Sequence, residues 1–510
     1  MRTPYDNGNE YYLEQVRPFV RDGWAFAVQD CRGRFDSGGE WYAWGNEVED
    51  GPDTHAWLGA QPWCAGIGTI GSSYDGCTQW LGARGGSAHL RAMVPAVCPS
   101  DLWLQDQYVG GALAHGLNLS WAIRNAGRGR LEFTPDELRE LWWRLPLVDS
   151  DHAAGVHVQW YRDWLDHPAY DGYWRSVSNH EAFELMHAPA LNIAGWYDAY
   201  AGAAFVNYAG MAERGGSEAA RRGGRVVMGP WHHHIGTERV VGDVDFGPDA
   251  IVDLHALQRR YLDRWVRGID NGLDAEAPIR IFVMGENRWR DEMEWPLART
   301  LWTELFLADD RSLAEQSPER DRPDAFTYDP ADPVITTGGN HSLVNPGITV
   351  GPVDQRGVEA RADVVSYTGP VLAEPLEVTG PVSATIWFSS SAPDTDVTAR
   401  LVDVHPDGRA INICEGVLRT RYRDSIEEPV MMTPGEAYLM PIDLGVTSNV
   451  FRAGHRLRLD ISSSNFPRID RNPNTGGRIG FETELRIAHQ RIHHSAARPS
   501  RMRLPVIPRL

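Results

Sequence analysis

Three short stretches of the chain carry residue types that could together hydrolyse an ester or an amide. The stretch GTIGSSYDG, at residues 68–76, places two serines between glycines directly after a short apolar run. Asp198 follows the apolar run ALNIAG, and His233 follows the run RVVMG. A serine hydroxyl is a weak nucleophile that needs an adjacent base, itself oriented by a carboxylate. The chain order serine, aspartate, histidine is the order of α/β hydrolases.

The glycines around the two serines fit a nucleophile elbow only in part. In that turn the pattern G-x-S-x-G supplies small residues, because the backbone bends sharply between a strand and a helix. Gly71 is in place before Ser73, but the second glycine is displaced to Gly76. The elbow therefore requires Ser73 as the nucleophile, with the Tyr74 N–H in the oxyanion hole. On this pattern alone an ordinary glycine-rich turn is an equal alternative.

The aspartate and the histidines also have other interpretations. A single aspartate after a strand is usually a turn former or a helix cap. The run His232, His233, His234 could bind a metal, but adjacent side chains diverge and no cysteine or acidic histidine motif lies nearby. We therefore expect no metal site and no cofactor. The chain contains no lysine, which excludes mechanisms that need a lysine amine.

The sequence also predicts the elements that must position these residues. Short apolar runs end in glycine-containing turns and alternate with helical patterns, which favours buried parallel strands in an α/β fold. The runs are WAFAVQD (24–30), IGTI (67–70), LRAMVPAV (90–97), ALNIAG (190–195) and RVVMG (225–229). In such sheets the chemistry occurs at the carboxyl ends of the strands. Ser73, Asp198 and His233 each follow such an end.

The chain has 510 residues, too many for one hydrophobic core, and its character changes twice. Between residues 101 and 185 helical patterns dominate; one helix has Thr134 as N-cap and Glu137 closing a capping box. After residue 300 long strand patterns dominate, with a hairpin turn at HPDG. We predict an α/β-hydrolase core at 1–100 and 186–300, an inserted helical cap at 101–185, and a jelly-roll-like β-sandwich at 301–510.

The composition of the chain limits the kinds of molecule that it is expected to bind. The net charge of −20 disfavours nucleic acid and anionic membranes, since both require basic patches. The five cysteines are scattered, which argues against a disulfide framework or a structural zinc site. The N-terminus is polar and no apolar run is long enough to span a bilayer. We expect a cytoplasmic protein with a small-molecule substrate, acting alone or as a homo-oligomer.

Taken together, the motifs resemble those of the cocaine-esterase-like and X-prolyl dipeptidyl-peptidase superfamily of serine hydrolases, which includes the α-amino acid ester hydrolases. The similar stretches cover nearly the whole chain and are GSSYDG, GWYDAY, MGPWHH, RTPYD, QDCRGRFDSGGEW, HPAYDGYW and FVMGENRWRDEMEWP. The resemblance implies that Ser73 attacks an ester or amide carbonyl and that Asp198 orients His233. It also implies that the Tyr5 hydroxyl joins the Tyr74 N–H in the oxyanion hole.

The chain departs from this family in two places. Members usually carry further residues before the RTPY-like motif, which here begins at residue 2. Without them we expect an uncovered sheet edge and a Tyr5 without its anchoring strand. Either the true start lies upstream, or the chain is a shortened member with a weakened oxyanion hole. In addition, the amino acid ester hydrolases place acidic residues directly after the triad aspartate, where this chain has Ala199, Tyr200 and Ala201. This difference disfavours α-amino acyl substrates, although Asp106, in DLWLQDQY, could partly replace that charge.

Tryptophans in the predicted cap suggest an apolar acyl pocket beneath it. We place Trp103, Asp106 and Trp121 in this pocket, with Trp142 and Trp143 as further aromatic candidates. Tryptophan at helical spacing more often belongs to a hydrophobic core, and Asp106 could equally be a solvated cap residue, so these assignments are hypotheses.

The sequence thus predicts a serine esterase or amidase that works through an acyl-enzyme. Alternatives within the family are an X-Pro dipeptidyl-peptidase and an α-amino acid ester hydrolase. An alternative of another class is a catalytically impaired scaffold or a carbohydrate-binding protein.

Overall fold

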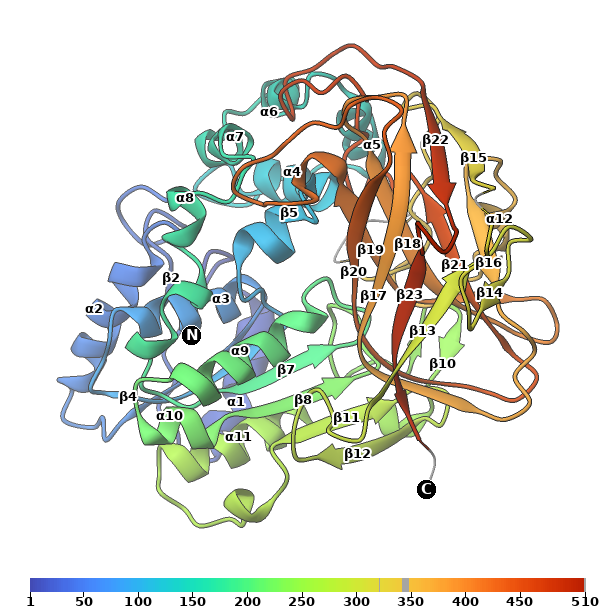
Figure 1. Ribbon diagram of the computed structural model, residues 1–510. Coiled ribbons are helices and arrows are strands. Elements are labelled where there is room, and N and C mark those ends of the chain that lie inside the picture. Colours follow the sequence, from blue (N-terminus) through green and yellow to red (C-terminus); the bar gives the residue numbers. More distant parts are fainter. Residues whose placement is uncertain (321, 342–347, 509–510) are drawn as a thin grey trace.

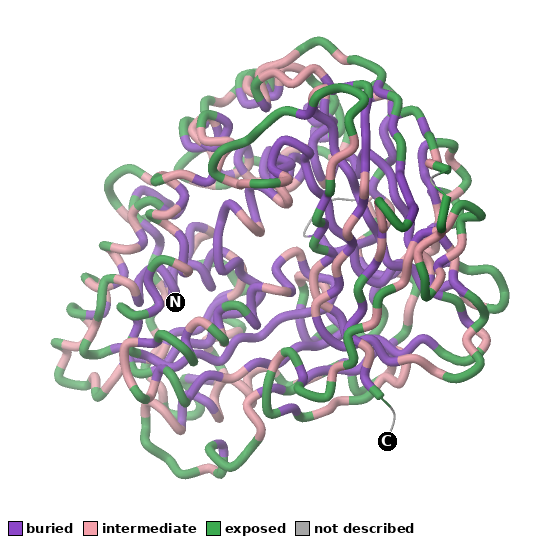
Figure 2. Tube along the Cα trace, viewed as in Figure 1, coloured by how far each residue is buried: buried purple, intermediate pink, exposed green. Residues whose placement is uncertain are grey.

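The structure, a computed structural model, describes residues 1–320, 322–341 and 348–508 (Figure 1). An α/β region and a β-sandwich lie side by side, with a group of helices above the α/β region in this view. The strands of both regions are largely buried, whereas the exposed residues concentrate in loops and on outer helices (Figure 2). Among the described residues, no helix is both long and apolar enough to cross a membrane.

A six-stranded sheet forms the centre of the α/β region, in the order β12-β11-β8-β7-β4-β3. All neighbouring strands are parallel except the pair β11 and β12. The strands are β3 (Ile67–Ser72), β4 (Leu90–Ala96), β7 (Leu191–Gly195), β8 (Arg225–Gly229), β11 (Ile279–Val283) and β12 (Arg288–Glu292). The four apolar runs from 67 to 229 therefore form the strands predicted for them. Their carboxyl ends lead to the serine, aspartate and histidine of interest.

Helices cover both faces of this sheet, which explains why its parallel strands are apolar along most of their length. Met93 and Val94 are successive residues of β4 but belong to different hydrophobic clusters, one on each face. The helices of this region are α1 (Glu10–Arg21), α2 (Glu47–Gly59), α3 (Tyr74–Arg84), α9 (Ala201–Arg214), α10 (Glu218–Gly223) and α11 (Leu254–Trp265).

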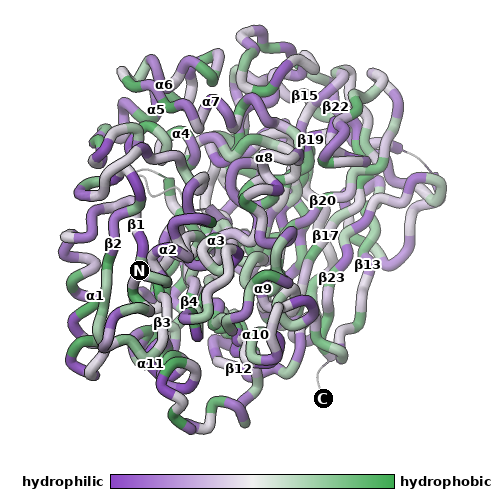
Figure 3. Tube along the Cα trace, turned by 90° about the vertical axis from the view of Figure 1, so that its left-hand side faces the viewer, coloured by the Kyte–Doolittle hydropathy of each residue, from purple (hydrophilic) through white to green (hydrophobic). Residues whose placement is uncertain are grey.

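The apolar run at 24–30 forms a strand only in its last two residues, so the longer strand predicted there was wrong. β2 (Gln29–Asp30) pairs in parallel with β1 (Arg2–Thr3), beside α1 (Figure 3). β1 is too short to provide a ladder for the rest of the run, and composition alone cannot replace a partner strand. β3 lies at the edge of the six-stranded sheet, as expected. Tyr5, however, directly follows β1, so the prediction that it lacks an anchoring strand was wrong.

The segment between β4 and β7 is mainly helical, as predicted. It contains η1 (Trp103–Gln107), α4 (His115–Arg124), α5 (Pro135–Trp143), η2 (Leu147–Asp149), α6 (Ser150–Ala153), α7 (Gln159–Asp166), α8 (Gly172–Arg175), η3 (Asn179–Glu181) and η4 (Phe183–Leu185). It also contains a small hairpin of β5 (Tyr108–Val109) and β6 (Ala112–Leu113), which the sequence did not predict. The expected capping box is present at α5, where the Glu137 N–H donates to Thr134 Oγ1 over 3.3 Å.

The C-terminal region is a β-sandwich of two sheets. One sheet has the order β14-β13-β23-β17-β22-β15 with β20 paired to β17, and the other has the order β16-β21-β18-β19. Their strands are β13 (Leu301–Leu307), β14 (Leu313–Ala314), β15 (Asp324–Tyr328), β16 (Val365–Thr368), β17 (Leu376–Ser390), β18 (Asp396–Val404), β19 (Ala410–Arg419), β20 (Tyr438–Phe451), β21 (Arg456–Ser462), β22 (Ala488–His493) and β23 (Arg501–Ile507). The smaller elements are β9 (Val240–Val241), β10 (Val244–Asp245), η5 (Pro248–Ala250), η6 (Leu273–Ala275), α12 (Arg356–Glu359) and η7 (Thr420–Tyr422).

The sandwich is joined to the helical segment by buried polar contacts. The Leu113 N–H donates to Asp470 Oδ1 over 3.0 Å, across 357 residues of sequence. Asp470 also binds Arg419, which is buried. The Tyr422 hydroxyl donates to the Pro168 carbonyl over 2.7 Å. The helical segment is therefore held from both the α/β and the sandwich sides.

Candidate active site

Ser73 occupies a strained turn between β3 and α3, with φ 60° and ψ −125°. Such a conformation is unfavourable for a residue with a side chain and is found mainly at functional sites. The two residues that flank this turn, Gly71 and Asp75, approach each other closely: a Cβ on Gly71 would lie 2.6 Å from Asp75 Cβ. Only one of these two positions therefore has to be glycine. Gly76 is required by another neighbour, since its Cβ would lie 2.8 Å from Cys98 Sγ. These contacts explain the displaced glycine of the motif.

Asp198 and His233 face each other from the loops after β7 and β8. His233 Nδ1 lies 2.6 Å from Asp198 Oδ2, and the Tyr200 N–H donates to Asp198 Oδ1 over 2.9 Å. The two loops approach closely because Gly195 has no side chain; a Cβ there would lie 2.2 Å from the Trp231 carbonyl oxygen. Asp198 is fully buried.

The electrostatics around His233 favour its protonated form. Burial alone lowers the pKa of His233, but the carboxylate of Asp198, assisted by that of Asp106, outweighs burial and raises this pKa above its ordinary value. An imidazole in this setting can accept a proton on Nε2, while Nδ1 remains bound to the carboxylate.

Ser73 and His233 line one cavity of about 970 Å³. Tyr5 and Tyr74 line it as well, and their rings lie 6.3 Å apart. Trp121 Nε1–H donates to the Tyr5 hydroxyl oxygen over 2.8 Å, which leaves the Tyr5 proton for another acceptor. The Tyr74 N–H belongs to the first turn of α3, where backbone donors have no partner within the helix. The structure thus brings the two expected oxyanion donors to the cavity that contains the serine.

A buried network that the sequence did not predict connects these donors. The Tyr5 N–H donates to Thr3 Oγ1 over 3.2 Å, and Thr3 Oγ1 lies 2.5 Å from the Tyr12 hydroxyl. The Tyr12 hydroxyl in turn donates to Asp75 Oδ2 over 2.8 Å. Burial raises the pKa of Asp75 to about 7. The one signal of this network in the sequence is Asp75 itself, a carboxylate in a segment that is otherwise suited to a buried helix.

The three pocket residues proposed from sequence occupy different environments. Asp106 is buried at the cavity, where its oxygens accept from the Tyr200 hydroxyl over 2.6 Å and from Gln107 over 3.0 Å. Burial raises the pKa of Asp106 to about 6. Trp121 also lines the cavity.

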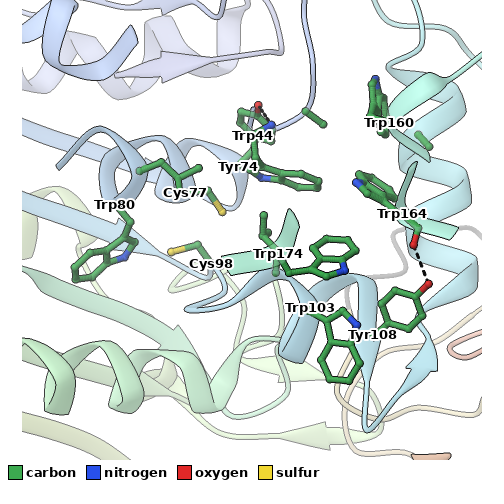
Figure 4. Close-up of a cluster of buried hydrophobic side chains, with 14 of the residues drawn as sticks. Trp44, Tyr74, Cys77, Trp80, Cys98, Trp103, Tyr108, Trp160, Trp164 and Trp174 are labelled. Atoms are coloured by element: carbon green, nitrogen blue, oxygen red, sulfur yellow. Dashed lines mark hydrogen bonds between the residues drawn. The ribbon is translucent and has the colours of Figure 1, made fainter. Parts of the chain in front are cut away.

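Trp103 lies elsewhere. Its side chain is fully buried and stacks on Tyr108 at 5.6 Å (Figure 4). Its indole N–H donates to the Pro168 carbonyl. Trp142 donates to Ser120 in the core, and Trp143 packs on Phe466. These three tryptophans are not among the residues that line the cavity, so the aromatic pocket is smaller than predicted.

The described part of the chain contains three groups whose ligand atoms lie within 4.8 Å of one another and could hold a metal ion. They are Asp151, His152 and His157; His232, His234 and Glu238; and Asp403, His405 and His455. In the second group, His232 Nε2 lies 3.1 Å from Glu238 Oε2. The interpretation that the histidine run lacks a neighbouring partner was therefore wrong, because Glu238 folds back onto it.

Comparisons with known proteins agree with this geometry. Residues 1–235 match the family model described as X-Pro dipeptidyl-peptidase (S15 family). Residues 271–503 match the model of the X-Pro dipeptidyl-peptidase C-terminal non-catalytic domain. The chain is 38% identical to a cocaine esterase of Rhodococcus sp., in an alignment that covers 100% of this chain and 93% of the relative. It is 28% identical to a putative serine esterase of Mycobacterium bovis, over 96% of this chain and 84% of the relative.

Two solved structures share the fold. An α-amino acid ester hydrolase superposes with a TM-score of 0.86 at 24% identity, covering 99% of this chain and 91% of the other. An aminopeptidase from a marine sediment Thaumarchaeota archaeon superposes with a TM-score of 0.85 at 22% identity, with the same coverage. These likenesses extend across both the α/β region and the sandwich.

Proposed function

Since this chain belongs to the serine hydrolase family of cocaine esterase and the X-Pro dipeptidyl-peptidases, we propose that Ser73, His233 and Asp198 are the triad with which it hydrolyses small esters. The protein is a hydrolase of the α/β type with a C-terminal β domain. We further propose the division into a core at 1–100 and 186–300, a cap at 101–185 and a sandwich at 301–510. A cytoplasmic location remains a prediction from composition.

The proposed reaction begins with attack of Ser73 Oγ on the substrate carbonyl carbon. His233 Nε2 accepts the hydroxyl proton, and Asp198 keeps the imidazole oriented and stabilises its charged form. The negative charge that develops on the carbonyl oxygen is received by the Tyr74 N–H and the Tyr5 hydroxyl. The ester C–O bond then breaks as His233 returns the proton to the leaving alcohol.

In the second half of the reaction, water replaces the serine hydroxyl as the nucleophile. A water molecule attacks the acyl-enzyme carbonyl while His233 accepts one of its protons. The bond to Ser73 Oγ breaks, the serine recovers its proton from His233, and the acid is released. Apart from this water, no group outside the chain and the ester is required to balance these steps.

One observation carries this proposal. The hydrogen-bonded pair of Asp198 and His233 extends from adjacent strand ends, and its imidazole lines the cavity that also contains the strained Ser73. A strained serine that lines the same cavity as such a pair supports nucleophilic catalysis more strongly than a binding role.

The test is labelling by a fluorophosphonate probe together with turnover of 4-nitrophenyl esters. We expect the wild-type protein to be labelled, and Ser73→Ala to lose labelling and at least about 1000-fold in kcat. The matched control is Ser72→Ala, the adjacent serine, which should still be labelled. Undiminished turnover by Ser73→Ala would refute the assignment.

A second candidate activity is cleavage of substrates with a free amino terminus, such as X-Pro peptides or α-amino acid esters. The buried carboxylate of Asp106 at the cavity favours it, because a carboxylate could hold an ammonium group. However, both Asp106 oxygens already accept hydrogen bonds, and burial raises its pKa. Faster hydrolysis of an X-Pro anilide than of its N-acetylated form would establish this activity.

A further inference from the structure

Helix α4 presents an arginine to the same cavity as the proposed nucleophile. Leu117, Trp121 and Arg124 all line the cavity, and their spacing of four and three residues places them on one face of the helix. Trp121 donates to the hydroxyl of Tyr5, so Arg124 lies one helical turn beyond the contact that fixes a proposed oxyanion donor. An arginine at this position can reach a bound substrate.

The guanidinium of Arg124 has no partner among the residues that the structure describes. Its Nε is buried without a hydrogen-bond acceptor, and no ion pair or side-chain hydrogen bond involves it. Burial, followed by the nearby charge of Arg130, lowers the pKa of Arg124, although a guanidinium stays charged in proteins. An unpaired buried donor is costly, and a ligand anion would satisfy it.

A purely structural role explains Arg124 poorly. Arginines in the last turn of a helix often bind its free carbonyl groups. Within the described chain, no donor of Arg124 makes such a bond. Its neighbour Arg128, in contrast, binds the carbonyls of Phe35 and Ser37 and thereby fastens the following loop.

A second arginine faces the cavity from that loop. The Leu131 N–H donates to the Arg124 carbonyl over 2.8 Å, so the chain returns to the end of α4 and brings Arg130 to the cavity. The loop is held by the buried Arg34, which donates to the Asn125 carbonyl over 3.0 Å. Among the described residues, the one ion pair of Arg130 is an exposed contact of 3.6 Å with Glu132. The backbone that carries the two cations is thus held in place before any substrate binds.

The acidic groups at the cavity do not neutralise this side. Asp106 is bound by Tyr200 and Gln107, and Asp75 is bound by Tyr12. Glu14 lines the cavity as an exposed residue and forms no ion pair within the described residues. On α4 and its following loop, Glu132 lies near both cations and offsets part of their charge. Arg124, Arg128 and Arg130 outnumber it, so this face keeps a net positive charge within a chain whose net charge is −20.

We propose that Arg124, assisted by Arg130, binds a carboxylate of the substrate, so that this hydrolase acts on esters that carry an anionic group. A guanidinium matches a carboxylate because its planar N–H groups can form two parallel hydrogen bonds. The inference rests on the proposed function, since it names the substrate class of the same site. It also predicts that esters with a cationic group are poor substrates.

The test compares esters that differ only at the far end of the acyl chain. We would measure kcat/KM for the 4-nitrophenyl monoester of adipic acid, for 4-nitrophenyl hexanoate and for 4-nitrophenyl 6-aminohexanoate. The expected order is anionic above neutral above cationic. Arg124→Gln should reduce the ratio of adipate to hexanoate values by about 10- to 100-fold, as expected for charge-assisted hydrogen bonds. Arg124→Lys should retain part of the preference, because it keeps the charge without the planar group.

The matched control is Arg139→Ala, which removes an equal charge from an exposed position on α5 that does not line the cavity. This variant should keep the wild-type ratio. In addition, free adipate should inhibit hexanoate hydrolysis competitively in the wild type and more weakly in Arg124→Gln. A wild type that prefers hexanoate, or a ratio unaffected by Arg124→Gln, would overturn the inference while leaving the hydrolase assignment intact. Turnover of neither ester, with no labelling of Ser73, would overturn both.

Discussion

Replacing Asp75 by asparagine should change how the stability of the protein depends on pH. Burial raises the pKa of Asp75 from 3.8 to about 7, and the Tyr12 hydroxyl bonds one carboxyl oxygen. In the unfolded chain the carboxyl group ionises near its ordinary pKa. Between these two values the folded state binds more protons than the unfolded state, so the contribution of Asp75 to stability is lost as pH rises towards 7.

The magnitude follows from the span of pH in which the two states differ. Each pH unit well below the folded-state pKa costs about 1.4 kcal/mol, and at pH 7 the carboxyl group of Asp75 is half ionised in the fold. The wild type should therefore lose about 2.3 kcal/mol between pH 5 and pH 7 relative to the variant. With an unfolding entropy of about 2 cal/mol/K per residue, a 510-residue chain that unfolds as one unit loses about 1 kcal/mol per degree. The Tm of Asp75→Asn minus that of the wild type should therefore rise by about 2 °C between pH 5 and pH 7, and should level off only about one pH unit above the folded-state pKa.

The assay is thermal unfolding followed by circular dichroism at intervals from pH 5 to pH 9. The control is Asp270→Asn, which removes a carboxylate from an exposed position. Its Tm difference from the wild type should not change across the same range. A difference between Asp75→Asn and wild type that is flat from pH 5 to pH 9 would show that Asp75 is ionised in the fold, and the reasoning would be wrong.

Three further predictions concern catalysis. Tyr5→Phe removes a proposed oxyanion donor and should lower kcat for 4-nitrophenyl esters by about 100- to 1000-fold with little change in KM; an unchanged kcat would exclude Tyr5 from the oxyanion hole. Asp106→Asn removes a carboxylate that raises the pKa of His233, so the acidic limb of the kcat/KM profile should move to lower pH; movement to higher pH would contradict the electrostatics. Gly195→Ala places a Cβ 2.2 Å from the Trp231 carbonyl oxygen and should separate the loops that carry Asp198 and His233, reducing kcat at least about 10-fold; wild-type kcat would show that the loops can yield.

The parts of the fold that could be predicted from sequence are those encoded over short distances. The strands β3, β4, β7 and β8 appear as apolar runs because both faces of a parallel sheet are covered. The start of α5 appears as a capping box because its hydrogen bonds join residues three apart. Since the carboxyl ends of parallel strands meet at one edge, the position of each motif directly after a strand predicted that Ser73, Asp198 and His233 lie at the same edge of the sheet.

The parts that could not be predicted depend on contacts between distant residues. Nothing near Asp75 in the sequence identifies Tyr12, which is 63 residues away, as its partner. The spacing of Trp103 and Trp121 does not specify which side chain faces the cavity, because that is set by how each element packs. The run at 24–30 has the composition of a strand, yet its neighbours determine how much of it pairs.

The hydrogen bond from Leu113 to Asp470 also has a consequence for biosynthesis. Its two partners are 357 residues apart, and ribosomes add roughly 5–20 residues per second. The hairpin of β5 and β6 within the helical segment must therefore wait roughly 20–70 seconds after its own translation before its acceptor exists. A nascent chain with a complete triad would still lack this support, so the enzyme should become active only near the end of its synthesis.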